Sequence, residues 1–280
     1  MVFSHSRLSS YENCPRQYQY RYIDKLEMPV EGVEAFVGKR VHEVLERLYH
    51  HVRTHGRPPT LAQVISRFRR DWAFHWHADI RIVREENDAA FYQEHGVRCL
   101  ENYYRANYPF DFGETIGVEQ PVTLVLDEGG RYQMRGVIDR LVRTREGRFE
   151  VHDYKTSASL PPRWRLERDR QLPVYQIAVQ QAHADAQEVD LVWHFLAFNR
   201  TVRSSRTAEQ LDELREATIR CIDEIEAASD FPTRTGPLCR WCDYRDLCPA
   251  GSAHTGIQPE PEGEPAPPQP PVSRGQLSLL

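Results

Sequence analysis

The chain has 280 residues and a mass of 32.7 kDa, which suffices for one large domain or two small ones. Its composition, with 40% apolar and 28% charged residues, is typical of a globular protein, and the absence of any run of 18 apolar residues excludes a membrane-spanning segment. The net charge of −5 gives no overall attraction to nucleic acid, although an enzyme can concentrate positive charge in one groove.

The N-terminal residues MVFSHSRLSSYENCP lack the apolar core of a signal peptide, so we expect a cytoplasmic protein. Disulfides are rare in that compartment, and the six cysteines therefore need another explanation. Of the 36 basic residues 33 are Arg, and the three Lys are Lys25, Lys39 and Lys155. A compact ammonium serves a different purpose from a planar guanidinium, which draws attention to Lys155.

Helices are predicted for the first part of the chain, residues 6–108, because apolar and aromatic residues recur there at helical spacing. Cys14-Pro15 interrupts the first helix near its start, and Gly56-Arg-Pro-Pro ends the second. The predicted helices cover residues 6–25, 31–51, 60–76 and 87–108.

The second part predicts a sheet and further helices. The turn sequences Asp127-Glu-Gly-Gly and Arg145-Glu-Gly separate three strand patterns and indicate an antiparallel meander. An Arg-rich stretch at 161–170 reads as a loop. The predicted elements are strands at 115–126, 132–144 and 148–155, a helix at 169–184, strands at 191–198 and 202–206, and a helix at 208–229.

The composition changes at Gly251, where Pro, Gly and Glu dominate and apolar periodicity ends. We therefore expect a folded domain over residues 1–250 and a disordered tail over 251–280. The tail ends in the small apolar cluster QLSLL.

Two carboxylates and one ammonium stand out in the meander. Asp139 interrupts the apolar run Gly136-Val-Ile-Asp-Arg-Leu-Val, where a carboxylate is costly unless it is paired. Asp153 and Lys155 are two residues apart and therefore share one face of their strand. They could form a solvated ion pair, or they could join Asp139 to hold Mg²⁺ or Mn²⁺ beside a phosphate.

Three further polar residues could support such a site. His42 lies on a helix whose other face is apolar, and it could be either a structural histidine or a metal ligand. Gln171 and Tyr175 have i,i+4 spacing on a predicted helix, so their polar ends share one face.

Four cysteines form a second candidate site. Cys239, Cys242 and Cys248 give the spacing C-x2-C-x5-C, and Cys14 is a distant fourth. Four thiolates suit zinc or an iron–sulfur cluster. Cys99 and Cys221 fall within predicted helices and read as ordinary buried thiols.

The order and spacing of these motifs resemble those of the PD-(D/E)XK nucleases, in particular the RecB-like branch. The resemblance implies an α/β fold with a restriction-endonuclease-like core, in which helices flank a mixed central sheet, together with an α-helical insertion. It implies that His42, Asp139, Asp153 and the Tyr154 carbonyl bind a metal, that Lys155 is the catalytic lysine, and that Gln171 and Tyr175 support it. The Ile138-Asp139 pair departs from the Pro-Asp of the family motif, a substitution that this branch commonly carries.

The cysteine layout is similar to the iron–sulfur staple of AddB-type and CRISPR-adaptation nucleases. This resemblance favours a [4Fe–4S] cluster held by Cys14, Cys239, Cys242 and Cys248, with structural Zn²⁺ as the alternative. The cluster would pin the first helix to the C-terminal segment.

The expected function is a Mg²⁺- or Mn²⁺-dependent deoxyribonuclease of repair or recombination, acting as an exonuclease on single-stranded DNA or DNA ends. The alternative is a catalytically weak DNA-end-binding or scaffold subunit of a helicase–nuclease or CRISPR-adaptation complex. The arginines of the 161–170 loop could guide a DNA strand or simply be solvated: they are Arg163, Arg165, Arg168 and Arg170.

Two partners are considered. No phosphate-loop motif of the form G-x-x-x-x-G-K-[ST] occurs, so unwinding would require a separate helicase. The last five residues, Gln276 to Leu280, resemble the peptide by which bacterial repair proteins bind the sliding clamp, or they are a meaningless apolar terminus.

Overall fold

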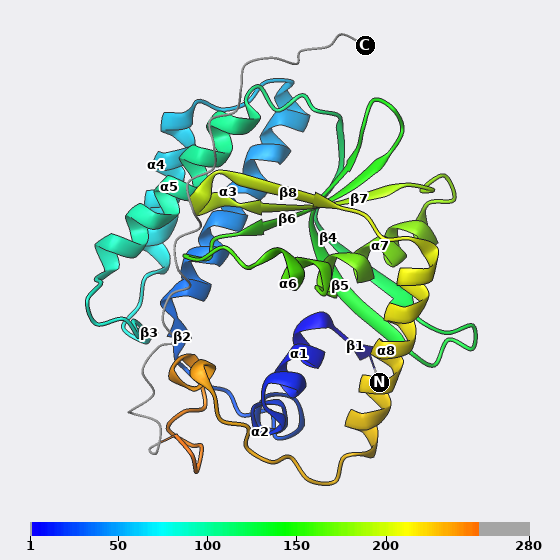
Figure 1. Ribbon diagram of the computed structural model, residues 1–280. Coiled ribbons are helices and arrows are strands. Elements are labelled where there is room, and N and C mark those ends of the chain that lie inside the picture. Colours follow the sequence, from blue (N-terminus) through cyan, green and yellow to red (C-terminus); the bar gives the residue numbers. More distant parts are fainter. Residues whose placement is uncertain (1, 252–280) are drawn as a thin grey trace, which may run out of the picture.

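The computed structural model describes residues 2–251, and a six-stranded mixed sheet forms its centre (Figure 1). One edge of β5 pairs with β4, and the other edge is shared by β1 and β6, which contact different parts of it. The sheet continues from β6 to β7 in parallel and from β7 to β8 antiparallel. The strands are β1 (Val2–Phe3), β4 (Glu114–Val125), β5 (Gln133–Arg143), β6 (Phe149–Lys155), β7 (Val189–Phe195) and β8 (Arg200–Ser204).

Helices cover both faces of the sheet and enclose two hydrophobic cores. On one face, α3 (Val33–His55), α4 (Leu61–His75) and α5 (Ala89–Asn107) form a helical layer around residues such as Phe68 and Leu100. On the other face, α1 (His5–Asn13), α7 (Gln171–Ala182) and α8 (Ala208–Ala227) pack around Trp193 and its neighbours. The prediction of a mixed sheet flanked by helices is confirmed.

The antiparallel meander is also confirmed, since β4–β5 and β5–β6 both pair antiparallel. The predicted interruption of the first helix at Cys14-Pro15 is present. At Cys14 the backbone is extended (φ −160°), which separates α1 from α2 (Pro15–Tyr18), and a π-helical turn at Gln19–Ile23 follows. The break lies before Pro15 because proline lacks an N–H and favours the first position of a new helix.

Several short elements were not predicted, among them one helix and one pair of strands. The Arg-rich stretch expected to be a loop contains the five-residue helix α6 (Arg163–Glu167). The strands β2 (Glu31–Gly32) and β3 (Ile80–Arg81) form a separate parallel pair. Such short segments carry too few residues to show a periodic pattern.

The C-terminal part of the described chain returns to the first helices. The backbone N–H of Arg16 donates to the carbonyl of Pro232 (3.3 Å), and the hydroxyl of Tyr244 donates to the carbonyl of Leu26 (3.2 Å). A 3₁₀ helix at Pro237–Trp241 lies within this segment, which runs beside α2 and β2 (Figure 1). None of the helices within residues 2–251 has the length and apolarity needed to cross a membrane.

Candidate active site

The candidate active site lies where β5 and β6 separate. The two strands pair from Arg143 and Phe149 as far as Arg140 and His152, after which β6 remains paired only with β7. Asp139 and the three residues Asp153–Lys155 occupy this divergence, which we call the strand fork. The backbone N–H of Tyr154 donates to Asp139 Oδ2 at 2.8 Å. This side chain thus replaces the backbone acceptor that β5 would supply if the two strands were still paired here.

His42 reaches the strand fork from α3. Its Nε2 lies 2.9 Å from the Tyr154 carbonyl oxygen, which can only accept a hydrogen bond, so Nε2 carries the proton. Its Nδ1 lies 3.6 Å from Asp139 Oδ2 and 3.6 Å from Glu119 Oε1. Once His42 is neutral, its Nδ1 lone pair faces two carboxylates, as that of a metal ligand would.

Glu119 belongs to this group, although the motif comparison did not identify it. It lies in β4 between residues that pair with Arg140 and Ile138, and it therefore lies beside Asp139 across the strand pair. Its φ of 45° is in the left-handed region, which costs a residue with a side chain on the order of 1–3 kcal/mol and often marks a functional site. The ligand atoms of His42, Glu119 and Asp139 lie within 4.8 Å of one another, so these three residues could hold a metal ion.

The protonation of the site reflects this crowding. Burial raises the pKa of Asp139 to about 7, and the neighbouring Asp153 carboxylate adds to the effect while His42 opposes it. Burial by itself would lower the pKa of His42, but Asp139, Glu119 and the Tyr154 carbonyl raise it to about 9. The carboxylates around His42 thus stabilise positive charge at this site, whether a bound proton or a metal ion.

Lys155 and Asp153 lie together on one face of β6, as their spacing predicts. Lys155 Nζ is 3.0 Å from Asp153 Oδ1 and 2.7 Å from Oδ2, and it donates to Gln171 Oε1 at 2.9 Å. Burial would lower the pKa of Lys155, but Asp153 reverses this effect, so the pKa is raised and the group remains an ammonium. Gln171 thus fixes the position of Lys155 from α7.

Tyr175 lies one helical turn after Gln171 and packs against β5. A Cβ atom at Gly136 would be only 2.3 Å from Tyr175 Cε1, so glycine is needed there to admit the ring. Burial raises the pKa of the Tyr175 hydroxyl, which interacts with Gln171 and with the backbone of Val137. The tyrosine therefore supports the helix–strand contact and, through Gln171, the position of Lys155.

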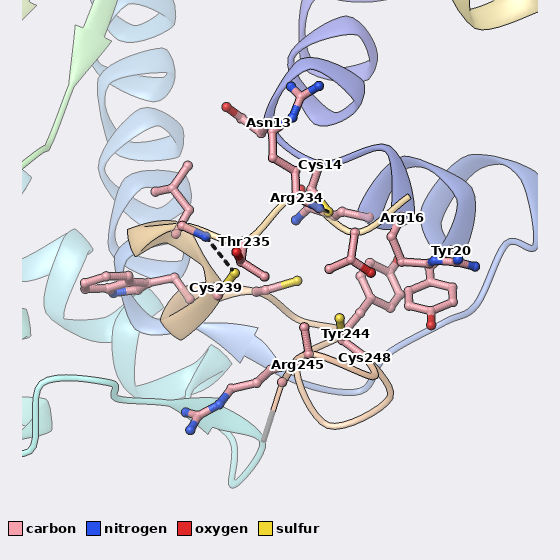
Figure 2. Close-up of a pocket in the computed structure, with 18 of the residues that line it drawn as sticks. Asn13, Cys14, Arg16, Tyr20, Arg234, Thr235, Cys239, Tyr244, Arg245 and Cys248 are labelled. Atoms are coloured by element: carbon pink, nitrogen blue, oxygen red, sulfur yellow. Dashed lines mark hydrogen bonds between the residues drawn. The ribbon is translucent and has the colours of Figure 1, made fainter. Parts of the chain in front are cut away.

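The four predicted cysteines gather at one cavity of about 480 Å³ between α1–α2 and the C-terminal segment. In Figure 2 the side chains of Cys14, Cys239 and Cys248 point into a common space. The backbone N–H of Arg234 donates to Cys14 Sγ, and that of Gly236 donates to Cys239 Sγ, both at 3.4 Å. Burial raises the pKa of the Cys242 thiol, and the proximity of Cys14 and Cys239 contributes to the rise.

The four arginines around α6 make three kinds of contact. Arg163 pairs with Glu167 of the same helix at 3.0 Å. Arg170 makes a two-pronged ion pair with Glu12 of α1 (2.9 and 2.7 Å), which anchors the start of α7. Arg165 and Arg168 lie against the Trp164 ring, with Cζ 5.6 and 5.7 Å from its centroid. Trp164 is 54% exposed, so this aromatic–basic surface faces solvent.

The chain was compared with protein families, curated proteins and solved structures. A family model described as the PD-(D/E)XK nuclease superfamily matches residues 2–249. No curated protein matches the chain. Among solved structures, the crystal structure of SSO0001 is similar at 16% sequence identity and a TM-score of 0.35, over 85% of this chain and 94% of that chain.

Proposed function

This chain belongs to the PD-(D/E)XK nuclease superfamily, and we propose that it is a Mg²⁺- or Mn²⁺-dependent deoxyribonuclease that degrades single-stranded DNA or DNA ends during repair or recombination. The observation that carries the proposal is the strand fork. There the group of His42, Glu119 and Asp139 lies beside Lys155, whose ammonium is held by Asp153 and Gln171. Such a set matches hydrolysis of a phosphodiester.

The proposed metal ligands are His42, Asp139, Asp153 and the Tyr154 carbonyl, to which we add Glu119. The ligand atoms of His42, Glu119 and Asp139 are already within 4.8 Å of one another. Their carboxylate oxygens suit a hard divalent cation, and Asp153 would join them on release from Lys155. The bound ion would polarise the scissile phosphate and lower the pKa of a water molecule.

Lys155 would act on the phosphate directly. Its ammonium lies beside Asp153 at the end of β6 and is 33% exposed, so a DNA phosphate can approach it. A fixed cation there stabilises negative charge as it develops on the phosphate oxygens and orients the attacking water. The hydrogen bond to Gln171 keeps the ammonium in this position.

For the cysteine pocket, formed by Cys14, Cys239, Cys242 and Cys248, we propose a structural [4Fe–4S] cluster. Within residues 2–251, no three of the cysteine sulfurs all lie within 4.8 Å of one another. A zinc ion with Zn–S bonds of 2.3 Å would need sulfurs about 3.8 Å apart. The cavity of about 480 Å³ leaves room for the larger cluster, and the two N–H···S contacts would stabilise thiolate ligands of either metal site.

Two partners complete the proposal. A helicase would supply single strands, since the sequence contains no phosphate-loop motif. The peptide Gln276–Leu280 lies outside the described residues, as does the predicted disorder of 252–280, and we propose from its sequence that it binds the sliding clamp.

Digestion of end-labelled single- and double-stranded DNA with Mg²⁺ or Mn²⁺ tests the nuclease proposal. We expect Lys155→Ala to reduce the cleavage rate by about 10²- to 10³-fold, the loss typical of a group that stabilises transition-state charge. Lys25→Ala, which changes an exposed lysine elsewhere, should cleave at the wild-type rate. If wild type and Lys155→Ala are equally inactive in all conditions, the DNA-end-binding or scaffold function is favoured instead.

A further inference from the structure

A second cavity adjoins the strand fork. It has a volume of about 290 Å³, and Lys155 forms part of its wall. The loop after β6 contributes Leu160, Pro161 and Pro162, while β7 contributes Trp193 and Phe195. Ligand pockets usually span about 300–1,000 Å³, so this cavity is suited to one small group rather than to a longer ligand.

The β7 residues of this cavity lie one strand away from Asp153 and Lys155 of β6. In the β6–β7 register, Trp193 is opposite Asp153 and Phe195 is opposite Lys155, on the same face of the sheet. Neighbouring strands are about 4.8 Å apart, so a group in the cavity would lie next to a phosphate held at the strand fork.

One wall carries a polar group that the protein does not satisfy. Trp193 is 0% exposed, and its indole Nε1–H has no hydrogen-bond partner within the described residues 2–251. A buried indole N–H normally finds an acceptor, because leaving a donor unpaired is unfavourable. Trp193 also lines the cavity, so an acceptor on a ligand in the cavity would lie near this indole.

We propose that this cavity is a nucleobase subsite, which receives the unpaired base beside the scissile phosphodiester. The apolar walls of Leu160, Pro162 and Phe195 suit the faces of a base, and the Trp193 N–H suits a base carbonyl or ring nitrogen. Asp169 and Arg165 also line the cavity, and the Asp169 carboxylate can accept a hydrogen bond from an exocyclic amino group. The aromatic Trp164, exposed beside it on α6, offers a stacking surface for the next base.

This inference rests on the proposed nuclease function and narrows its substrate. A base within a duplex is paired and stacked, so it can enter the cavity only from a single strand, a frayed end or a flipped nucleotide. The subsite therefore predicts that the enzyme selects single-stranded DNA at the base next to the cut and not only through phosphate contacts.

The experiment measures binding of single-stranded oligonucleotides in which one abasic position is moved along the strand, with Ca²⁺ in place of Mg²⁺ or Mn²⁺. We expect one position to weaken binding, and the same position in cleavable substrates to adjoin the cut. Trp193→Phe keeps a ring and removes the N–H, and it should lower discrimination among bases at that position by about threefold to tenfold. Trp72→Phe, in the other hydrophobic core, should leave discrimination unchanged.

A surface variant provides a test that does not disturb the core. Leu160 is 37% exposed, and Leu160→Trp should fill the cavity and abolish the effect of the abasic position, whereas Leu160→Ala should preserve it. Cleavage with a flat abasic profile would overturn the subsite and leave the nuclease proposal intact. A profile with one sensitive position in a protein that cuts no DNA would overturn the nuclease proposal and support the subsite.

Discussion

Asp139 and His42 bind protons more tightly than free side chains do, and this has two opposite consequences for pH dependence. The pKa of Asp139 is about 7 instead of 3.8, and that of His42 is about 9 instead of 6.5. Both raised values stabilise the metal-free fold most at low pH, below the unfolded-state pKa values. This stabilisation is lost as the pH rises through about 7 and then about 9.

Metal binding has the reverse dependence, because both ligands must lose their protons first. We expect the melting temperature of the metal-free protein to fall between pH 6 and pH 9, while the increase produced by Mn²⁺ becomes larger. Below pH 7, Mn²⁺ affinity should fall about tenfold per pH unit for each proton displaced. Thermal melts and calorimetric titration check both slopes, and Asp139→Asn, but not the exposed Asp212→Asn, should remove the Mn²⁺ effect.

Glu119 provides a second test at the level of single residues. Glu119→Gln preserves shape and removes one negative charge beside His42 and Asp139. We expect the half-saturating Mg²⁺ concentration for DNA cleavage to rise by about 10- to 100-fold or more, because even the loss of a group that only supports a metal ligand has an effect of about that size. Glu128→Gln, in the exposed β4–β5 turn, is the matched control, and equal metal requirements in the two variants would contradict the assignment.

The contrast between Asp139 and Glu119 shows how far sequence reasoning reaches at this scale. Asp139 stands out in the sequence because it interrupts an apolar strand, whereas Glu119 is followed by Gln120 and Pro121 and interrupts no apolar run. Motif order pointed to the first and not the second. The left-handed backbone at Glu119, which directs it toward the site, arises from strand pairing and leaves no local signal.

At the level of secondary structure, the long helices and the meander could be predicted, because periodicity and turn residues are local properties. The divergence of β5 and β6 could not, because it depends on β7 pairing with β6 all the way to Lys155. Trp193 was missed for the same reason. Its partnership with Asp153 joins strands that are far apart in the sequence.

The cysteine pocket gives a prediction about how elements are joined. A crosslink from Cys14 to Cys239 closes a loop of 225 residues (239 − 14), which by the chain-entropy relation stabilises the fold by about 5 kcal/mol. We expect Cys242→Ala to lose the broad visible absorbance of the cluster and to melt at a lower temperature, while the cleavage rate per folded molecule changes little. Absorbance spectra, iron analysis and melts after anaerobic purification measure these effects.

Cys221→Ala is the control, because Cys221 lies in α8 and does not line the pocket. It should retain the absorbance and the melting temperature. A colourless wild-type protein with stoichiometric zinc after anaerobic purification would contradict the iron assignment and favour the zinc alternative.

At the level of the whole molecule, the proposed clamp peptide at residues 276–280 lies far along the sequence from the last proposed catalytic residue, Tyr175. Deletion of residues 276–280 should therefore abolish capture by immobilised sliding clamp and leave DNA cleavage in solution unchanged. Capture that is equal with and without these residues would end the clamp proposal without affecting the nuclease proposal.

The return of the C-terminal segment to α1 and α2 also affects how the protein is made. Every proposed catalytic residue lies between His42 and Tyr175, so a ribosome completes all of them well before it reaches Phe231. The contacts of Arg16 with Pro232 and of Tyr244 with Leu26 can form only after that point. During translation, the first helices therefore make these contacts only after the last part of the domain has been synthesised. A prematurely terminated chain would contain the catalytic side chains but lack the contacts that hold α1 and α2.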